Sequence, residues 1–353
     1  MDWRSLGGVV LVVCGAGGFI GGYLVKSLIA LGERVRAIDI KPLSDWYQLS
    51  DEADNVQADL RLRESCHEVL SQASAVYNLA CDMGGIGFIE NNKAECMLNV
   101  LINTHLLMAA KDHRVSKYFF ASSACVYAAS KQDSTKGTAL CEKDAYPAMP
   151  EDGYGWEKLF GERMCRHFSE DFGIATRVGR FHNVYGPYGA YDGGREKAPA
   201  AICRKVIEAK FSGREYLDIW GDGNQTRSFT YIDDCIKGIE LLMKSDVAEP
   251  LNVGSSEAVT INELVDLVEA IAGTQLERRY QPSAPLGVAG RNSDNSMIRR
   301  HLGWEPSIRL REGLEKTYSW IYQEMSNALG QTAHEGNEKT SNQNPTIPIR
   351  SSK

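Results

Sequence analysis

The chain of 353 residues contains no apolar run that approaches the roughly 20 residues needed by a membrane-spanning helix. The apolar stretch 9–20 is interrupted by Gly15, Gly17 and Gly18 and lacks a plausible cleavage site, so we interpret it as a buried first strand and not as a signal peptide. An excess of positive charge is absent too, because 39 Lys and Arg stand against 46 Asp and Glu, for a formal charge of −7. The sequence therefore predicts neither a nucleic-acid partner nor a membrane partner.

Paired cysteines are also lacking. The nine cysteines are odd in number, include no Cys-x-x-Cys pair and form no tight cluster with histidine. This pattern argues against a disulfide framework and against a structural zinc site, so no metal is expected. We predict a reducing, cytoplasmic setting, where structural disulfides are rare.

The first half of the chain contains an alternation of strand-like and helix-like segments. Strand-like apolar runs at 9–14, 34–40, 75–80, 117–122 and 174–180 alternate with helix-like runs at 20–31 and 97–110. This alternation predicts an α/β fold with a doubly wound parallel sheet. Turn-rich segments at 185–189 and 192–194 interrupt the pattern, and a smaller C-terminal α/β substrate-binding lobe is expected to begin near there.

Local signals predict three features of the second half. Thr260 and Glu263 have the spacing of a capping box for a helix over 264–272. A strand at 228–232 is expected to end at Asp233 and Asp234, which would act as N-cap residues of the next helix. From about residue 326 the sequence turns polar, with few residues able to form a core, so we predict a disordered tail over 326–353.

A glycine-rich turn is the first functional motif. Gly15, Gly18 and Gly21 recur every three residues between the first strand and the first helix, where missing side chains let backbone N–H groups and the helix N-terminus meet a pyrophosphate. Asp39 ends the second strand, where a carboxylate can accept the hydroxyls of a ribose and would repel a 2′-phosphate. The motif therefore predicts NAD in preference to NADP. The full set expected to bind the cofactor is Gly15, Gly18, Phe19, Ile20, Gly21, Asp39, Asp59 near the adenine, Tyr154 and Lys158.

A second motif suggests the chemistry. Tyr154 and Lys158 are four residues apart on a predicted helix and share one face, so the ammonium is expected to lower the phenol pKa from about 10 and make it a usable base. Such a base removes an alcohol proton while a nicotinamide takes the hydride. Cys125 is surplus to alcohol oxidation, but a thiolate near a new ketone is suited to removing a proton from the adjacent carbon. Oxidation followed by carbon deprotonation opens an epimerase reaction.

Several longer stretches strengthen this interpretation. Segments 82–89, 121–125, 179–183, 193–201, 220–229 and 290–295 together make the chain similar to the GDP-mannose 3,5-epimerases, within the extended short-chain dehydrogenase/reductase superfamily of nucleotide-sugar enzymes. The resemblance runs from about residue 9 to 322. It implies a mainly NAD-binding Rossmann domain at 1–180 and a mainly nucleotide-sugar-binding lobe at 181–325, with some return to the first domain. Cys81 stands where an alanine is common, a departure that is not expected to touch the chemistry.

The resemblance implies a redox-neutral cycle on GDP-mannose. Tyr154, supported by Lys158 and Ser123, lets NAD oxidise the hexose C4 hydroxyl; Cys125 and Lys197 then exchange protons at C3 and/or C5, giving GDP-L-galactose and/or GDP-L-gulose. The implied catalytic residues are Ser123, Cys125, Tyr154, Lys158 and Lys197. The implied substrate-binding residues are Gly84, Ser123, Ala124, Cys125, Asn183, Glu196, Lys197, Ala198, Lys205, Gln225, Thr226, Arg227 and Arg291. A homodimer is the usual assembly in this superfamily.

Alternatives remain open from the sequence alone. A free cysteine such as Cys125 is commonly a small buried hydrophobe, and Lys197 follows two charged residues as a solvated loop would. A GDP-fucose-synthase-like epimerase-reductase would also use a cysteine beside the serine, but Asp39 and Lys197 argue against its NADPH and its histidine acid. A non-catalytic dinucleotide-sensing protein is a third possibility, opposed by the presence of both Tyr154 and Lys158. The residues do not decide between epimerisation at C5 alone and at both carbons.

Overall fold

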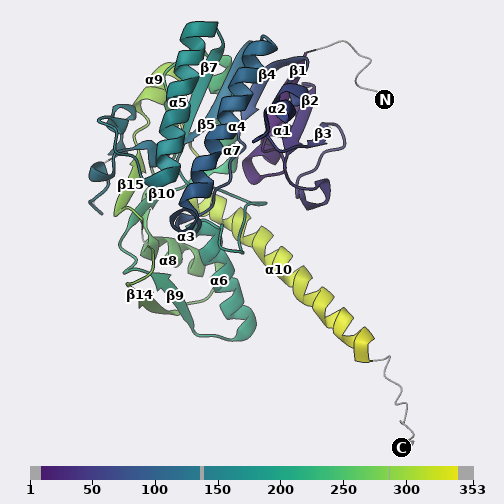
Figure 1. The fold of residues 1–353 in the computed structure, drawn as a ribbon. Coiled ribbons are helices and arrows are strands. Elements are labelled where there is room, and N and C mark those ends of the chain that lie inside the picture. Colours follow the sequence, from purple (N-terminus) through teal and green to yellow (C-terminus); the bar gives the residue numbers. More distant parts are fainter. Residues whose placement is uncertain (1–8, 136–138, 286, 341–353) are drawn as a thin grey trace, which may run out of the picture.

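A parallel sheet of seven strands forms the centre of the molecule, in the order β12-β7-β5-β4-β1-β2-β3 (Figure 1). The computed structural model describes residues 9–135, 139–285 and 287–340. The predicted doubly wound α/β sheet is confirmed. Its strands are β1 Val10–Cys14, β2 Val35–Asp39, β3 Asp54–Gln57, β4 Ala73–Asn78, β5 Lys117–Ser123, β7 Ala175–Phe181 and β12 Leu251–Val253.

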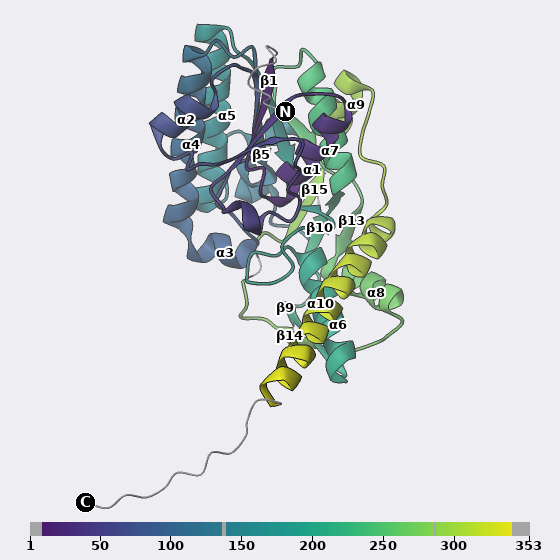
Figure 2. The same cartoon turned by 90° about the vertical axis from the view of Figure 1, so that its right-hand side faces the viewer.

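Helices cover both faces of this sheet (Figure 2). Successive strand residues point to opposite faces, so Val12 and Phe120 enter the core under α2, α4 and α5, while Val13 and Phe119 enter the core under α1 and α7. Because both faces are buried at the centre of the sheet, strand β1 is apolar throughout, whereas the edge strand β3 is largely polar and only partly buried. The helices of these two layers are α1 Phe19–Ala30, α2 Arg63–Val69, α4 Lys93–Asp112, α5 Asp152–Phe172 and α7 Ile232–Lys244.

The second lobe lies below the carboxyl ends of the central strands in the view of Figure 1. It contains a four-stranded sheet in the order β13-β10-β15-β6, and the separate pairs β11-β8 and β14-β9. Its strands are β6 Ala139–Leu140, β8 Val184–Tyr185, β9 Tyr216–Trp220, β10 Thr226–Ser228, β11 Thr230–Tyr231, β13 Ala258–Thr260, β14 Glu277–Gln281 and β15 Gly290–Ser293. The remaining helices are α3 Ile86–Asn91, α6 Ala198–Ser212, α8 Ile261–Ala272, α9 Ser296–Leu302 and α10 Leu310–Thr340.

The local predictions for this half meet with mixed results. The capping box is confirmed, because Thr260 Oγ1 accepts from the Glu263 N–H at 3.0 Å and the Glu263 carboxylate accepts from the Thr260 N–H at 2.7 Å. The prediction for the next helix is wrong. The residue at the N-cap of α7 is Tyr231, and Asp233 and Asp234 lie in the first helical turn. There the Asp234 carboxylate accepts backbone N–H bonds from the segment before α10.

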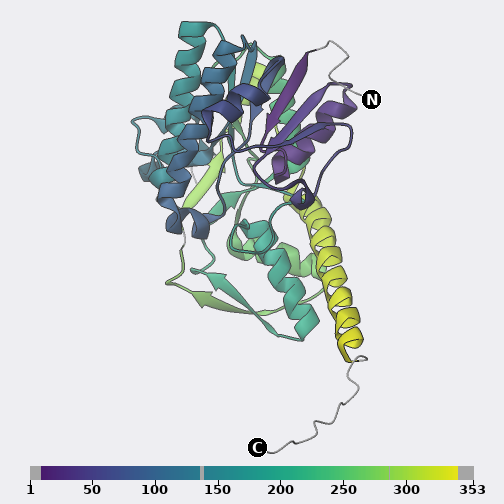
Figure 3. The same ribbon diagram turned by 45° about the vertical axis from the view of Figure 1, so that its right-hand side comes forward.

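Helix α10 begins against the lobe and extends well beyond it (Figure 3). It continues to Thr340, so the disorder predicted from residue 326 is wrong as far as that residue. A polar sequence does not prevent a helix, because helix propensity depends on backbone and rotamer preferences and not on burial. Residues 341–353 lie outside the described part of the chain.

Candidate functional site

The predicted site residues gather at the carboxyl ends of the central strands. Gly15 follows β1, Asp39 ends β2 and Ser123 ends β5, and Figure 1 shows the second lobe facing this edge. Ligands of open α/β sheets bind in the crevice outside the carboxyl ends of the strands. The fold therefore brings the cofactor motif and the proposed chemistry to one edge.

The glycine turn after β1 is built too tightly for side chains. Gly15 has φ of +84°, and a Cβ there would lie 2.9 Å from the Leu79 carbonyl; a Cβ at Gly21 would lie 2.1 Å from the Gly15 oxygen. Gly18 is the N-cap of α1 and brings no side-chain hydrogen bond to it. Backbone N–H groups at the start of α1, including those of Phe19 and Ile20, are thus the donors that the turn offers to an anion.

Asp39 and Asp59 have different surroundings. Asp39 is 8% exposed at the end of β2 and accepts the Lys41 N–H at 3.1 Å. Asp59 instead forms a forked pair with Arg61, whose Nε and Nη2 lie 3.0 and 2.7 Å from its oxygens, and the hydrogen bonds from Arg61 lower its pKa. The tight glycine turn and the Asp39 carboxylate at the next strand end fit the pyrophosphate and the ribose of NAD.

Helix α5 carries the tyrosine–lysine pair into the interior. Tyr154 is 5% and Lys158 3% exposed, and the Lys158 ammonium lies 5.6 Å from the centre of the Tyr154 ring. Burial raises the pKa of Tyr154, and the neighbouring thiols of Cys81 and Cys125 raise it further. The prediction that Lys158 lowers this pKa is therefore wrong for the protein alone. The ammonium is engaged elsewhere, 3.4 Å from the Glu157 carboxylate.

Cys81, expected to stand apart from the chemistry, lies beside it. Burial raises the pKa of Cys81 to about 12, against the opposing effect of Lys158 and its hydrogen bond to the thiol. The sulfur is thus a polar neighbour of the lysine ammonium, and this part of the prediction is wrong. The sequence shows a cysteine at position 81 but not its contact with Lys158, because a residue that follows a strand gives no indication of which side chain it will face.

The thiol of Cys125 occupies a short 3₁₀ turn that follows β5, at 124–126. Ser123 caps this turn, its Oγ accepting the Cys125 N–H at 3.2 Å. Burial opposes the thiolate, but the positive charge of Arg291, the Ser123 hydroxyl and then Lys197 outweigh it, so the pKa of Cys125 is lowered. Arg291 Nη1 donates to the sulfur at 3.6 Å. A thiol held in this way is present as the thiolate, the form that can act as a base, to a greater extent than an ordinary buried cysteine.

Lys197 approaches the same thiol from the second lobe. It is the N-cap residue of α6, with extended backbone, and Ala198 begins the helix. Burial lowers the pKa of Lys197, and the charge of Cys125 opposes that shift. The two side chains therefore interact electrostatically although 71 residues lie between them in the sequence. A solvated loop lysine would have neither feature.

The loop that contains Gly84 connects to the Lys197 segment. The Gly85 N–H donates to the Arg195 oxygen at 3.0 Å, and a Cβ at Gly84 would lie 3.1 Å from the Arg195 Cα. Arg195 also stacks its guanidinium on Phe88, 3.9 Å from the ring centre. Close backbone contact thus joins the loop before α3 to the start of α6.

The expected substrate cations are largely buried. Arg227 donates to the Thr226 and Val288 oxygens at 2.8 and 2.5 Å, and burial lowers its pKa to about 10. Lys205 donates to the Asp218 oxygen at 2.8 Å, and burial lowers its pKa too. Three other predicted contacts donate to backbone oxygens: Asn183 to Ser228 O at 3.0 Å, Gln225 to Trp220 O at 3.1 Å, and Thr226 to Thr135 O at 3.0 Å. The Glu196 carboxylate instead pairs with the Arg204 side chain at 3.3 Å.

Two further polar residues surround Arg291 that the sequence did not reveal. Gln132 Oε1 accepts from Arg291 Nε at 2.8 Å, and the Glu151 carboxylate pairs with the same guanidinium. Neither residue belongs to a periodic segment or a recognised motif. Glu151 directly precedes the helix that carries Tyr154, and that position is a signal by which the sequence could have indicated it.

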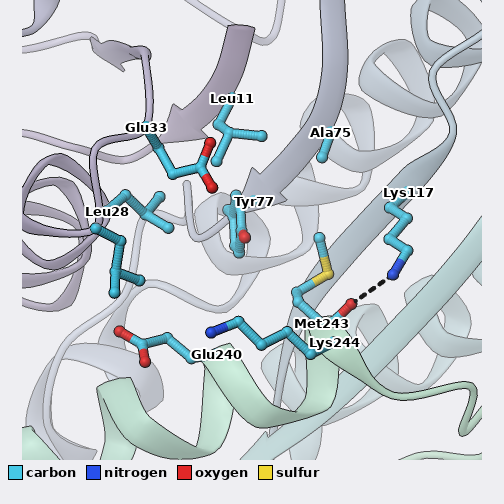
Figure 4. Close-up of a pocket in the computed structure, with 10 residues that line it drawn as sticks. Leu11, Leu28, Glu33, Ala75, Tyr77, Lys117, Glu240, Met243 and Lys244 are labelled. Carbon is cyan, nitrogen blue, oxygen red and sulfur yellow. Dashed lines mark hydrogen bonds between the residues drawn. The ribbon is translucent and has the colours of Figure 1, made fainter. Parts of the chain in front are cut away.

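A separate cavity of about 340 Å³ lies at the opposite edge of the sheet (Figure 4). Leu11, Ala75 and Lys117 line it near the amino ends of β1, β4 and β5, so it is distinct from the candidate site. The Lys117 ammonium there donates to the Met243 oxygen at 2.9 Å. Among the described residues no helix is long and apolar enough to cross a membrane, and no three His, Cys, Asp or Glu gather as a metal site would require.

A doubly wound sheet, a glycine turn at its carboxyl edge and a buried tyrosine–lysine pair beside a thiol together are typical of a dinucleotide-dependent enzyme. Residues 11–254 match the NAD dependent epimerase/dehydratase family, and the chain belongs to it, with NAD as its cofactor. It is 45% identical over 316 residues to the GDP-mannose 3,5-epimerase of Arabidopsis thaliana, a match that covers 89% of this chain and 82% of that protein.

More distant relatives share the architecture. GDP-L-fucose synthase 1 of Arabidopsis thaliana is 28% identical over 277 residues, covering 77% of this chain and 85% of that one. The crystal structure of a UDP-glucuronic acid 4-epimerase from Bacillus cereus, in complex with UDP-glucuronic acid and NAD, superposes with a TM-score of 0.77 at 27% identity, covering 89% and 99% of the two chains.

Proposed function

We propose that the chain is a GDP-mannose epimerase that inverts C3 and/or C5 of the hexose through transient oxidation at C4, giving GDP-L-galactose and/or GDP-L-gulose. One observation carries the proposal: a thiol with a lowered pKa and a lysine with a lowered pKa interact beside the tyrosine–lysine pair. A simple 4-epimerase has no need for such a pair. The identity to a GDP-mannose 3,5-epimerase supports the same substrate.

The first stage is alcohol oxidation. NAD, when bound, supplies the hydride acceptor and a positive charge. Tyr154 takes the C4 hydroxyl proton, and Ser123 holds the phenol by a side-chain hydrogen bond that lowers its pKa. Since burial keeps that phenol protonated in the protein alone, added positive charge is needed to release its proton. The Lys158 ammonium lies 5.6 Å from the centre of the phenol ring, but in the protein alone it does not offset the effect of burial on the pKa of Tyr154.

The second stage exchanges a proton on carbon. A C4 ketone acidifies both C3–H and C5–H, and inversion needs a base on one face and an acid on the other. The Cys125 thiolate suits the base, because Arg291 and Lys197 stabilise its charge. The Lys197 ammonium suits the acid, because burial makes its proton easier to release than that of a free lysine. Return of the hydride to C4 then completes the cycle without net redox change.

The nucleotide end of the substrate is assigned to the second lobe. Arg227 and Lys205 are the partly buried cations assigned to the diphosphate, and the buried Arg291 provides a third near Cys125. Arginine is suited to phosphate because its fork matches two oxygens at once. Asn183, Glu196, Ala198, Gln225 and Thr226 supply polar or backbone contacts, and Gly84 belongs to a loop over the sugar. The lobe is formed mainly by residues 181–325, of which α7 and β12 return to the central sheet.

A homodimer is the proposed assembly. Helices α4 and α5 expose large apolar side chains, with Met97 at 50%, Leu98 at 44%, Trp156 at 44% and Phe160 at 52%. A Cβ at Gly153 would lie 2.9 Å from the Met97 side chain, so the two helices that carry these side chains are in contact. A contiguous exposed apolar patch is typical of an association surface. A reducing, cytoplasmic location fits the free thiols found throughout the described residues.

Incubation with GDP-mannose and catalytic NAD in deuterated water tests the proposal directly. NMR should show deuterium at C3 and/or C5 and a changed ring stereochemistry, with no accumulation of free NADH. Growth of NADH in proportion to product would identify a dehydrogenase. Consumption of added NADPH would identify an epimerase-reductase instead.

A further inference from the structure

Arg291 is held from several sides at once. Its residue is 7% exposed, and its Nε donates to Gln132 Oε1 at 2.8 Å. A second guanidinium nitrogen pairs with the Glu151 carboxylate, and the third reaches Cys125 Sγ at 3.6 Å. Because all three nitrogens of the planar guanidinium have a partner, its orientation is fixed. In that orientation its positive charge lies beside the Cys125 sulfur.

Gln132 is itself fixed. It is 1% exposed, and its Nε2 donates to Glu151 Oε1 at 3.1 Å and to the Tyr127 oxygen at 3.3 Å. Because the amide nitrogen is committed to these two acceptors, the amide oxygen must face Arg291. Its backbone oxygen also accepts the Gly290 N–H at 3.1 Å, which ties this loop to the strand that carries Arg291.

Glu151 connects the two halves of the active site. Its backbone N–H donates to the Cys125 oxygen at 3.1 Å, and it is the N-cap residue of the helix that carries Tyr154. Its side chain pairs with Arg291 from the second lobe. One residue therefore touches the thiol turn, the tyrosine helix and strand β15.

We propose that Gln132 and Glu151 are positioning residues, which hold the Arg291 guanidinium against the Cys125 sulfur and so set the reactivity of the thiol that exchanges carbon-bound protons. The catalytic role of Cys125 in this inference rests on the proposed function. The control of its reactivity by two residues whose side chains do not touch it is independent of the substrate.

Four other residues also lie close to the Cys125 thiol. Lys197 approaches from the start of α6, Arg227 from β10 and Tyr154 from α5, while Ser123 bonds the turn itself. None of these contacts uses the side chain of Gln132 or Glu151, since Glu151 meets the thiol turn and the Tyr154 helix through its backbone. A change confined to the latter two residues therefore isolates the contribution of Arg291 orientation.

A charge-only role for Glu151 predicts the opposite of a positioning role. A carboxylate close to a thiolate disfavours it, so removal of the charge alone would make Cys125 more reactive. Under the positioning role, Glu151→Ala frees Arg291 and makes Cys125 less reactive. Glu151→Gln keeps an acceptor oxygen for Arg291 and removes the charge, so it should restore reactivity to at least the wild-type level.

Peptide-resolved alkylation provides the test. Wild type, Glu151→Ala, Glu151→Gln and Gln132→Ala are treated with iodoacetamide across a pH series, and mass spectrometry follows the peptide that contains Cys125. Glu170→Ala, an exposed carboxylate on the same helix, is the matched control. At neutral pH the two alanine variants at 151 and 132 should react about tenfold more slowly, the low end of what a displaced neighbouring charge does to a thiol.

Two results would overturn the proposal: faster alkylation in Glu151→Ala, or Gln132→Ala within twofold of wild type. Gln132→Ala carries no change of charge, so it remains decisive if Glu151→Ala does not fold. Thermal melting and NAD binding check the integrity of each variant. Because alkylation needs no sugar, the positioning result stands or falls separately from the assignment of GDP-mannose as substrate.

Discussion

Replacement of Glu162 by glutamine should destabilise the protein far more than the same change on the surface. Glu162 is 5% and Arg180 2% exposed, and they form a forked pair with bonds of 2.8 and 2.7 Å. The Ser122 hydroxyl also donates to this carboxylate at 2.5 Å. Glu162→Gln keeps one acceptor oxygen but removes the negative charge, so the buried guanidinium is left with neutral acceptors alone, among them the Glu142 oxygen at 2.7 Å. Removal of one partner from a buried pair costs about 3–5 kcal/mol.

The measurement is urea unfolding of the NAD-loaded protein. With a slope of about 3 kcal/mol per M, a loss of about 3 kcal/mol lowers the midpoint by roughly 1 M or more. Glu170→Gln is the matched control, because Glu170 pairs with Arg166 on the same helix at 2.7 Å while both side chains are about half exposed or more. Because solvent screens this exposed pair, its loss should move the midpoint far less than the loss of the buried pair. Equal shifts in the two variants would refute the argument that burial decides the cost.

Three other outcomes are expected. Tyr154→Phe should lose both product formation and transient reduction of bound NAD, whereas Cys125→Ala should still reduce NAD but lose at least about 10²-fold in deuterium exchange at carbon, measured by NMR. Gly21→Ala should weaken NAD binding at least tenfold by calorimetry, because its Cβ would lie 2.1 Å from a carbonyl oxygen, and Gly18→Ala, with 3.1 Å of room, should lose less. Burial lowers the pKa of His182 from 6.5 to about 4. As the pH falls, the unfolded chain therefore binds a proton at His182 before the folded protein does. The free energy of unfolding should thus fall by about 3 kcal/mol as the pH drops from about 6.5 to about 4, and His182→Gln should flatten this pH dependence.

The central sheet could be predicted because its signals are local. Runs of apolar residues mark strands buried on both faces, and the glycines at 15, 18 and 21 mark a turn in which backbone meets backbone. Thr260 and Glu263 likewise interact within one helical turn. Each of these features is encoded by residues a few positions apart, so each prediction required no knowledge of the tertiary fold.

Predictions that depended on distant neighbours fared less well. The pKa of Tyr154 is governed by burial and by thiols on other elements, and not by the lysine four residues away. The start of α7 was misplaced because Asp233 and Asp234 are good N-cap residues in isolation, whereas Asp234 is used to bind the backbone of 307 and 308. Sequence spacing shows which residues share a helix face, but it does not show which groups desolvate them.

The candidate site illustrates how chemistry arises from this non-local part of the fold. Cys125 taken alone is a half-buried cysteine at a strand end, and burial by itself would hold its proton. Strand β15 and the start of α6, more than 70 residues further along the chain, bring Arg291 and Lys197 to the sulfur and reverse that preference. The strand end thus becomes a base only when the second lobe has folded against it. A variant that separates the lobes should therefore retain the glycine turn and bind NAD, while its Cys125 reverts to the low reactivity of an ordinary buried thiol.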